Sequence, residues 1–193
     1  MAKKKQARRV VAVVGMPGAG KTEAAMYLLR KGLNRVYFGD CTFDEIKRLG
    51  LATNEKIEKK VREDLRKKHG MGAFAILSMP KINEASKFGD VVIESMYSWD
   101  EYKIVKEKFK SNFKVIAICA NKELRHKRLT GRKELKHGVA RKFSLKDAED
   151  RDFAQVDKIA TGGPIAIADY TIVNEGTKKE LFEKLDKIVK KIK

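Results

Sequence analysis

Residues 15–22 read Gly-Met-Pro-Gly-Ala-Gly-Lys-Thr and fit the pattern G-x-x-x-x-G-K-[ST]. An apolar run typical of a strand, residues 10–14, precedes this segment, and an amphipathic stretch typical of a helix follows it. In such an arrangement the backbone N–H groups of the loop point at phosphate oxygens, and the N-terminus of the helix adds to the positive field. The segment therefore predicts a nucleotide-phosphate site on an α/β fold.

Each residue type in this loop has a predicted role. The nucleotide-binding residues are predicted to be Gly15, Met16, Pro17, Gly18, Ala19, Gly20, Lys21, Thr22 and Glu23. The Lys21 ammonium group would reach the β- and γ-phosphates of ATP as a catalytic charge, and the Thr22 hydroxyl would help to hold Mg²⁺. The glycine spacing does not fit G-x-G-x-x-G, which excludes a dinucleotide site for NAD or FAD.

Four further apolar runs, typical of strands, alternate with helical patterns along the chain. They cover residues 35–38, 90–95, 113–120 and 169–174. Helices are predicted at 23–31, from Ser98 with Glu101 in a capping box, from Asn121, and from Thr177. We therefore expect a five-stranded parallel sheet flanked by helices, with ligands at the carboxyl ends of the strands.

The 193 residues fit one domain. Residues 41–88 carry mostly helical spacings, interrupted at Gly50 and at Gly70 to Gly72, and are predicted to form a helical insert. The core would comprise residues 8–40, 89–127 and 159–193. The pattern does not indicate an oligomeric state.

The net charge of +18 raises the question of a nucleic-acid partner. Five basic residues lie among the first nine, and residues 121–142 hold nine basic and two acidic side chains. No aromatic side chains alternate with these basic residues, as a stacking platform for single strands would require, so nucleic acid is not the favoured partner. A chain without a long apolar stretch and with two distant cysteines predicts a cytoplasmic protein without a membrane partner.

Beyond the loop, three segments carry a resemblance to a known family. They are Phe38-Gly39-Asp40, the carboxylate Glu94 after the third strand, and residues 162–176, which end in Ala-Asp-x-x-Ile-x-Asn-x-Gly. Nearly the whole chain resembles the small nucleotide kinases of the P-loop class, especially the dephospho-CoA kinase-like and adenylate kinase-like proteins and AAA-type ATPases of archaea. The resemblance implies an ATP- and Mg²⁺-dependent transfer of the γ-phosphoryl group to a small nucleotide-like acceptor. Dephospho-CoA is the preferred acceptor and a nucleoside monophosphate the alternative.

The resemblance also implies roles for the remaining segments. The insert at 41–88 would bind the acceptor, and a short basic lid at 128–147 would close over the phosphates. Arg128 and Arg132 would be catalytic lid arginines, although a solvated basic helix face explains them equally well. Asn174, Gly176 and Thr177 would line the adenine pocket, or serve only as turn and cap residues.

Two carboxylates bear on the chemistry. Asp40 would face the acceptor and take a proton from an acceptor hydroxyl, and its alternative role is a helix N-cap. Glu94 would bind Mg²⁺ or its water shell. The family places Asp-Gly where this chain has Glu94-Ser95, which would shift the metal geometry, and Phe43 and Tyr97 stand where one branch carries arginine.

A second class of function stays open. The net charge and the Glu94-Ser95 departure favour an ATP-dependent switch protein that contacts RNA or ribosomes. The three histidines, His69, His126 and His137, lie in charged surroundings and are predicted to be surface residues.

Overall fold

The computed structural model describes residues 8–131, 135–136, 139–140 and 143–192. Its centre is a five-stranded sheet with the spatial order β2-β3-β1-β4-β7, in which all four pairings are parallel. The strands are β1 (Val10–Val14), β2 (Asn34–Tyr37), β3 (Val91–Glu94), β4 (Phe113–Cys119) and β7 (Tyr170–Val173). The predicted five-stranded parallel sheet is confirmed, and each predicted strand end lies within one residue of the observed one.

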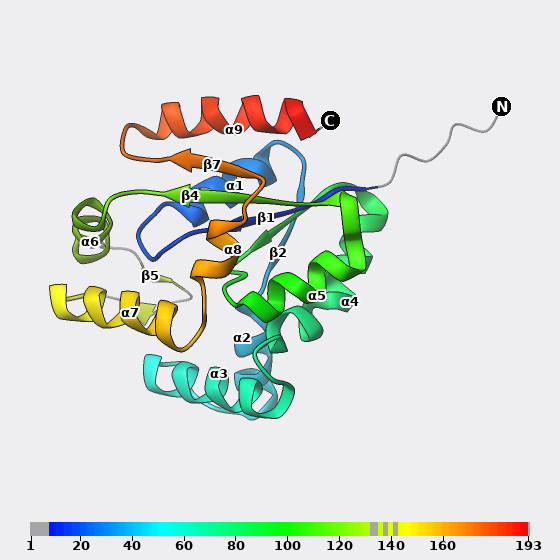
Figure 1. Ribbon diagram of the computed structural model, residues 1–193. Helices are drawn as coiled ribbons and strands as arrows, with labels where there is room; N and C mark the ends of the chain where they lie inside the picture. The colour runs from blue at the N-terminus through cyan, green and yellow to red at the C-terminus, as the bar shows by residue number, and fades with distance from the viewer. Residues whose placement is uncertain (1–7, 132–134, 137–138, 141–142, 193) are drawn as a thin grey trace.

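Helices connect these strands and cover the sheet (Figure 1). In chain order they are α1 (Lys21–Arg30), α2 (Asp40–Arg48), α3 (Glu55–His69), α4 (Ala73–Phe88), α5 (Trp99–Phe109), the 3-10 turn η1 (Lys110–Asn112), α6 (Lys122–Thr130), α7 (Leu145–Asp157), α8 (Gly162–Ala166) and α9 (Lys178–Ile192). Two short strands, β5 (Leu135–Lys136) and β6 (Val139–Ala140), pair antiparallel between α6 and α7.

Alternation along β1 shows how the two faces of the sheet are buried. Val11 and Val13 pack in one apolar cluster with residues of α1 and α9, whereas Val10, Ala12 and Val14 pack in another with residues of α4 and α5. Every residue of β1 is buried. This burial on both faces explains why the strand reads as a continuous apolar run instead of an alternating one.

Side-chain caps fix the starts of two helices that the sequence predicts. Ser98 and Glu101 form the predicted capping box at the start of α5. The side chain of Asn121 accepts a hydrogen bond from the Leu124 backbone N–H at 2.8 Å and so begins α6. Both caps satisfy N–H groups that have no partner within the first turn of a helix.

The predicted helical insert, residues 41–88, divides into two parts in space. Helices α2 and α3 lie away from the sheet, at the lower side of Figure 1. Helix α4 instead contacts β2 and β3 and buries Phe74 and Ile82 in the same cluster as Val10 of β1. Helix α4 therefore belongs to the helical layer of the sheet, and α2 and α3 pack against α4 and add Ile46, Val61 and Leu65 to the same cluster.

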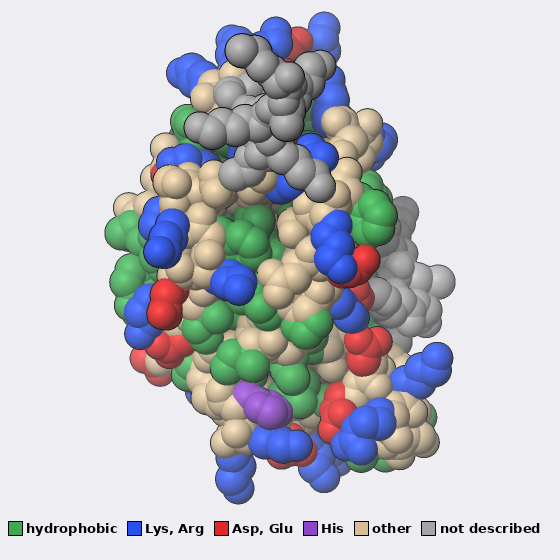
Figure 2. All heavy atoms as spheres, turned by 90° about the vertical axis from the view of Figure 1, so that its right-hand side faces the viewer, with side chains coloured by type: hydrophobic (Ala, Val, Ile, Leu, Met, Phe, Trp, Pro, Cys, Tyr) green, Lys and Arg blue, Asp and Glu red, His purple; other side chains and the backbone are tan. Residues whose placement is uncertain are grey.

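The surface charge is spread on the face that Figure 2 presents. Lys and Arg side chains lie scattered around this face, Asp and Glu side chains lie among them, and apolar side chains occupy much of its centre. No helix among the described residues combines the length and the apolar character needed to cross a membrane.

Candidate functional site

The phosphate loop, residues 15–22, follows β1 at the carboxyl end of the sheet and leads directly into α1. Gly15 and Gly18 have φ angles of +145° and +79°, which side-chain-bearing residues rarely adopt. A Cβ at Gly15 would lie 2.2 Å from the carbonyl oxygen of Ile118, and one at Gly18 would lie 2.4 Å from that of Arg125. These two positions therefore require glycine for both conformation and space.

Lys21 and Thr22 already have fixed partners. The Lys21 ammonium group donates a hydrogen bond to the Met16 carbonyl oxygen at 3.0 Å, within the same loop. The Thr22 hydroxyl donates to Glu94 Oε1 at 2.7 Å, which joins the start of α1 to the end of β3. Hydrogen bonds therefore fix both the Lys21 ammonium group and the Thr22 hydroxyl at the carboxyl end of the sheet.

Glu94 is a buried carboxylate, 1% exposed, with a cationic neighbour. Arg35 of β2 donates from Nε to Glu94 Oε2 at 2.7 Å, and β2 and β3 pair side by side. The contact between Thr22 and Glu94 offers two hard oxygen atoms of the kind that Mg²⁺ prefers, and Mg²⁺ completes its shell with water and phosphate oxygens. The predicted metal residues are therefore in contact with each other, and their role in holding Mg²⁺ stays a prediction.

Ser95 explains how the chain tolerates its departure from Asp-Gly. Its φ angle is +69°, in the left-handed region that glycine enters at no steric cost. The residue is 6% exposed, and its hydroxyl accepts a hydrogen bond from the Tyr97 hydroxyl at 3.1 Å. The backbone therefore keeps a glycine-like turn after β3 although a serine occupies it.

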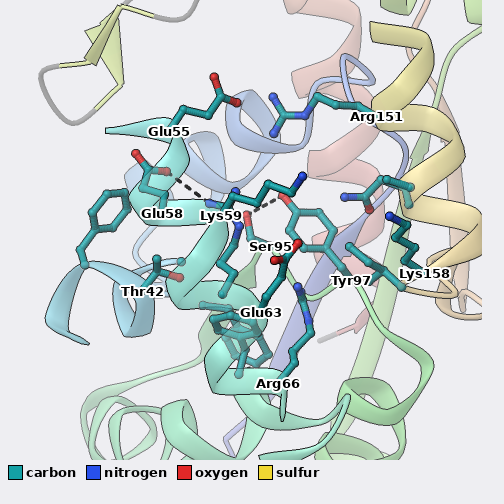
Figure 3. Close-up of a pocket in the computed structure, with 18 of the residues that line it drawn as sticks. Thr42, Glu55, Glu58, Lys59, Glu63, Arg66, Ser95, Tyr97, Arg151 and Lys158 are labelled. Carbon is teal, nitrogen blue, oxygen red and sulfur yellow. Dashed lines mark hydrogen bonds and ion pairs between the residues drawn. The ribbon is translucent and has the colours of Figure 1, made fainter. Parts of the chain in front are cut away.

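A cavity of about 670 Å³ lies beside the phosphate loop (Figure 3). Because α3 and α7 supply half of its lining residues, we call it the α3–α7 cavity. The Lys21 ammonium nitrogen lies 5.5 Å from the ring centroid of Tyr97, which lines the cavity, so the loop and the cavity are neighbours. The charged lining residues are Glu55, Glu58, Glu63, Asp147 and Asp150, with Lys59, Arg62, Arg66, Arg151 and Lys158. The aromatic lining residues are Tyr37, Phe38, Phe43, Phe74, Tyr97 and Phe143.

Asp40 begins α2, and Gly39 rather than Asp40 occupies the N-cap position of that helix. Gly39, Thr42 and Phe43 line the α3–α7 cavity, but Asp40 is not among its lining residues. The structure therefore places Asp40 next to the cavity wall without bringing it into the lining.

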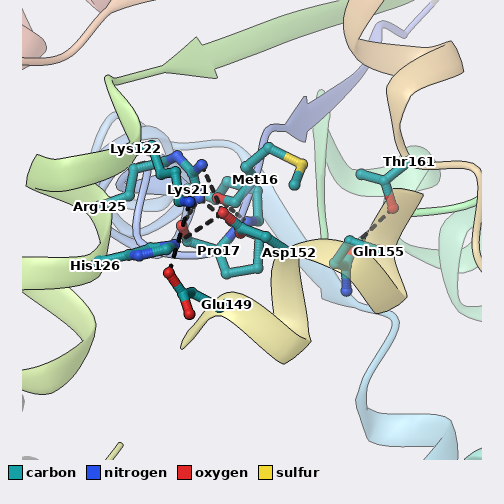
Figure 4. A network of polar contacts seen from close by, with 10 residues as sticks. All are labelled: Met16, Pro17, Lys21, Lys122, Arg125, His126, Glu149, Asp152, Gln155 and Thr161. Atoms are coloured by element: carbon teal, nitrogen blue, oxygen red, sulfur yellow. Dashed lines mark hydrogen bonds and ion pairs between the residues drawn. The ribbon is translucent and has the colours of Figure 1, made fainter. Parts of the chain in front are cut away.

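A polar network that the sequence did not predict connects α7 to the phosphate loop (Figure 4). Arg125 of α6 donates two hydrogen bonds to the carboxylate of Asp152 of α7, both at 2.8 Å, and one to the Pro17 carbonyl oxygen at 3.0 Å. His126 Nε2 lies 2.9 Å from the same carboxylate. Burial alone would raise the pKa of Asp152, but the hydrogen bonds from Arg125 and His126 outweigh it and lower that pKa. We call Pro17, Arg125, His126 and Asp152 the Asp152 network.

The prediction of a surface position is wrong for His126, which is 4% exposed. Charged neighbours in the sequence suggested solvent, but helical periodicity places His126 on the side of α6 that faces α7. No sequence spacing indicates its partner, because Asp152 lies 26 residues further along the chain.

The predicted lid arginines are only partly described. Arg128 lies on α6, and its Nη1 atom is buried without a hydrogen-bond partner among the described residues. Arg132 lies outside the described residues, as do His137 and several other positions of the predicted lid at 128–147. The catalytic role of both arginines stays a prediction.

Asn174 is hydrogen-bonded to the backbone of the phosphate loop. Its side-chain Nδ2 donates to the Ala19 carbonyl oxygen at 2.8 Å, and the residue is 7% exposed. Thr177 Oγ1 accepts a hydrogen bond from the Glu180 backbone N–H at 3.2 Å and so caps α9, and Gly176 precedes it. These contacts match the turn and cap chemistry, while an adenine-binding role for Asn174, Gly176 and Thr177 stays a prediction.

A G-x-x-x-x-G-K-T loop after the central strand of a five-stranded parallel sheet, with a cavity at its carboxyl edge, defines a P-loop nucleotide-binding protein. The AAA domain family matches residues 14–140. A UPF0200/UPF0201 protein of Archaeoglobus fulgidus is 34% identical over 185 residues, which are 95% of this chain and 56% of that protein. A UPF0200 protein of Thermococcus sibiricus is 30% identical over 185 residues, which are 95% of each chain. The chain therefore belongs to the AAA domain family and to the UPF0200 proteins. It spans about half the length of the Archaeoglobus relative.

Solved structures show which fold this is. The shikimate kinase from Bacteroides thetaiotaomicron matches with a TM-score of 0.57 at 14% sequence identity, over 94% of this chain and 98% of that one. At this identity the likeness shows the fold alone. The chain thus has the fold of a small-molecule P-loop kinase.

Proposed function

We propose that this protein is an ATP- and Mg²⁺-dependent phosphotransferase that moves the γ-phosphoryl group of ATP to a small nucleotide-like acceptor in the α3–α7 cavity. The observation that carries the proposal is the contact between the two halves of the site. Lys21 of the phosphate loop lies 5.5 Å from the ring of Tyr97, which lines the cavity. A γ-phosphate held by Lys21 would therefore face an acceptor in the cavity.

The residues of the loop would perform the binding of ATP. The backbone N–H groups at the start of α1 and the Lys21 ammonium group would hold the β- and γ-phosphates. Thr22 and Glu94 would hold Mg²⁺, which neutralises charge on the transferring group. The lid arginines Arg128 and Arg132 would add positive charge at the same group.

Helix α7 would exclude water from the transfer. It forms one wall of the α3–α7 cavity and is tied to the phosphate loop by the Asp152 network. Exclusion of water matters because water that reaches the γ-phosphate competes with the acceptor. The enzyme then hydrolyses ATP instead of transferring the phosphoryl group.

Dephospho-CoA is the acceptor that we prefer, and a nucleoside monophosphate is the alternative. An acceptor hydroxyl, as in dephospho-CoA, gains from a carboxylate that takes its proton, whereas an ionised phosphate does not. Asp40 is the proposed proton acceptor, and it adjoins Gly39 of the cavity wall. An Asp40→Asn variant that keeps full turnover of dephospho-CoA would remove Asp40 from this role.

The experiment that tests the proposal is ADP release from ATP and Mg²⁺, alone and with dephospho-CoA or each common nucleoside monophosphate. Strong stimulation by one acceptor, with formation of its phosphorylated product, is the expected result and names the substrate. Slow hydrolysis that no acceptor changes would contradict the kinase assignment.

A second function, an ATP-dependent switch that contacts RNA or ribosomes, is favoured by the net charge of +18. Binding through many phosphate contacts weakens steeply as salt increases, whereas binding of a small acceptor in a cavity changes little. A nucleotide-dependent RNA affinity that falls steeply between low and physiological salt, without acceptor turnover, would support this second function.

A further inference from the structure

Arg35 of β2 contacts Glu94 at the carboxyl end of the sheet. In the register of the parallel strands β2 and β3, Tyr37 pairs with Glu94, and Arg35 precedes Tyr37 by two residues and so lies on the same face. The Nε and Nη2 atoms of Arg35 lie 2.7 and 2.5 Å from Glu94 Oε2. The guanidinium carbon also lies 5.0 Å from the ring centroid of Tyr37. The cation is therefore held between a carboxylate and an aromatic ring.

The two oxygen atoms of Glu94 have different partners. Oε2 accepts from Arg35, whereas Oε1 accepts from the Thr22 hydroxyl at 2.7 Å. A hydroxyl has one proton to donate and two lone pairs, so Thr22 can donate to Glu94 and still offer its oxygen atom to a cation. Because Arg35 fixes Oε2, it also fixes the position of Oε1 and with it the direction of the Thr22 lone pairs. Arg35 therefore acts on the predicted metal position through Glu94.

The same contact balances the charge of Glu94. The Glu94 side chain is 1% exposed, and that of Arg35 is 27% exposed. A buried carboxylate without a counter-charge would be destabilising and would attract any cation that could reach it. Paired with Arg35, this carboxylate brings no net charge to the phosphate loop. A divalent cation at Thr22 then depends on other anionic oxygens, and the phosphates of a nucleotide are the ones that such a loop holds.

A second arginine–carboxylate pair, at the other end of β3, shows what is particular about the first. Arg9 forms an ion pair with Asp90, which precedes β3, and the Arg9 backbone N–H donates to Asp90 Oδ1 at 2.9 Å. The Arg9 side chain is 22% exposed and so is about as buried as that of Arg35. Arg9 precedes β1 and the phosphate loop follows β1, so this pair lies at the opposite end of the sheet from Thr22. Of the two pairs, the one at Arg35 is therefore placed to affect a cation at the loop.

We propose that Arg35 is a positioning residue that makes the binding of Mg²⁺ depend on the nucleotide. It acts through Glu94, because the ion pair orients the carboxylate toward Thr22 and cancels the charge that would otherwise bind a divalent cation alone. The loop would then take up Mg²⁺ only together with the phosphates of ATP or ADP. The proposal rests on the proposed function, in which Thr22 and Glu94 hold Mg²⁺ beside the nucleotide.

The test is the binding of a divalent cation to the full chain with and without nucleotide. Mn²⁺ prefers the same oxygen ligands as Mg²⁺, and its electron paramagnetic resonance signal separates free from bound ion. Without nucleotide, the unmodified protein is expected to leave Mn²⁺ free at about 1 mM, and Mg²⁺ should not raise its thermal unfolding midpoint. With ADP present, Mg²⁺ should raise that midpoint beyond the value reached with ADP alone.

Arg35→Met removes the charge and keeps much of the length of the side chain. We expect this variant to bind Mn²⁺ without nucleotide at least about 10-fold more tightly than the unmodified protein, the scale of one unit charge acting on a nearby divalent ion. Mg²⁺ alone should also raise the lowered unfolding midpoint of this variant, because the ion replaces the missing counter-charge. Arg35→Lys keeps the charge and should restore the behaviour of the unmodified protein. The double variant Arg35→Met/Glu94→Gln should lose the gained affinity, which would assign the bound ion to Glu94.

Arg9→Met is the matched control, because it also breaks a partly buried arginine–carboxylate pair of the same sheet. It should lower the unfolding midpoint as well. Mg²⁺ should not restore that midpoint, however, and the affinity for Mn²⁺ should stay as weak as in the unmodified protein.

Tight Mn²⁺ binding by the unmodified protein without nucleotide would overturn the proposal, and this measurement stands even if Arg35→Met fails to fold. A folded Arg35→Met variant with unchanged Mn²⁺ affinity would also overturn it. Failure of the proposed function looks different. Metal binding that follows Arg35 as expected, without turnover of any acceptor, would keep this inference and reject the kinase. Turnover of an acceptor, with metal binding indifferent to Arg35, would keep the kinase and reject the inference.

Discussion

The phosphate loop and the α3–α7 cavity meet at Lys21 and Tyr97, but their polar groups differ in how fully they are paired. At the loop, Lys21 donates to Met16, Thr22 donates to Glu94, and Asn174 donates to Ala19. On the cavity wall, Thr42 Oγ1 and Arg66 Nε have no partner among the described residues. The loop is therefore preorganised by the protein itself, whereas the cavity wall keeps these two buried polar atoms unpaired among the described residues.

Removal of the loop cation should have the largest effect. Lys21→Ala is expected to lower phosphoryl transfer by at least about 1,000-fold, because it removes the one cationic side chain of the loop at residues 15–22. Lys31→Ala is the control. Lys31 is an exposed lysine at the C-cap of α1, and it pairs with Asp186. ADP release with the stimulating acceptor measures both variants, and turnover retained by Lys21→Ala would reject the assigned role.

The Asp152 network is the link between the two regions, and breaking it should lower stability. Asp152→Ala leaves Arg125 and His126 without their shared carboxylate while both are largely buried. We expect a loss of about 2–3 kcal/mol in the free energy of unfolding, measured by urea denaturation.

Asp186→Ala is the comparison for this measurement, because its pair with Lys31 is more exposed. It should lower the free energy of unfolding much less than Asp152→Ala does. Equal losses in the two variants would show that the Asp152 network contributes no more than a surface ion pair.

Glu101 of α5, which accepts the backbone N–H of the cavity residue Tyr97, predicts a dependence of stability on pH. Its pKa in the folded protein is about 7, above the ordinary value of 4.5, so the folded state holds the proton more tightly than the unfolded state does. Stability should therefore fall as pH rises from about 4.5 to about 7, by up to about 3 kcal/mol from this group. Glu101→Gln should show a smaller fall when both proteins are unfolded in urea at about pH 5 and about pH 8. If the two proteins lose the same stability between these pH values, Glu101 is not the group responsible for the pH dependence.

Ser95, at the junction of loop and cavity, should show the smallest effect. Ser95→Gly relieves a left-handed backbone but adds flexibility to the unfolded chain, so we expect a gain of at most about 1 kcal/mol. Ser95→Ala keeps the strain and removes the acceptor of the Tyr97 hydroxyl, and it should be less stable than Ser95→Gly. The reverse order, measured by thermal unfolding, would show that the hydrogen bond outweighs the backbone strain.

Much of the fold could be predicted because its signals are local. The strand at residues 10–14, the loop at 15–22 and the caps at Ser98 and Asn121 each depend on residues within a few positions of one another. The contact of Thr22 with Glu94 could also be predicted, because the carboxyl ends of the neighbouring parallel strands β1 and β3 lie at the same edge of the sheet.

The cavity could not be predicted in the same way, because its parts are far apart in the sequence. The pairing of Arg125 with Asp152 depends on how α6 and α7 pack, and no spacing indicates it. Helical spacing alone could not separate α4, which covers the sheet, from α2 and α3, which do not. Arg66 looked like any other basic residue of a charged helix, since only its buried and unpaired Nε atom distinguishes it from Arg62, which pairs with Glu58.

Helix α7 is shared by both halves of the site. Asp150 and Arg151 line the cavity, while Asp152 binds Arg125, which in turn donates to the Pro17 carbonyl oxygen of the phosphate loop. Any displacement of α7 by a bound acceptor would therefore reach the loop. Thermodynamic reciprocity then requires that ATP alter the affinity for the acceptor by the same factor as the acceptor alters the affinity for ATP. The two substrates would thus influence each other through a single helix, in addition to their direct approach at Lys21.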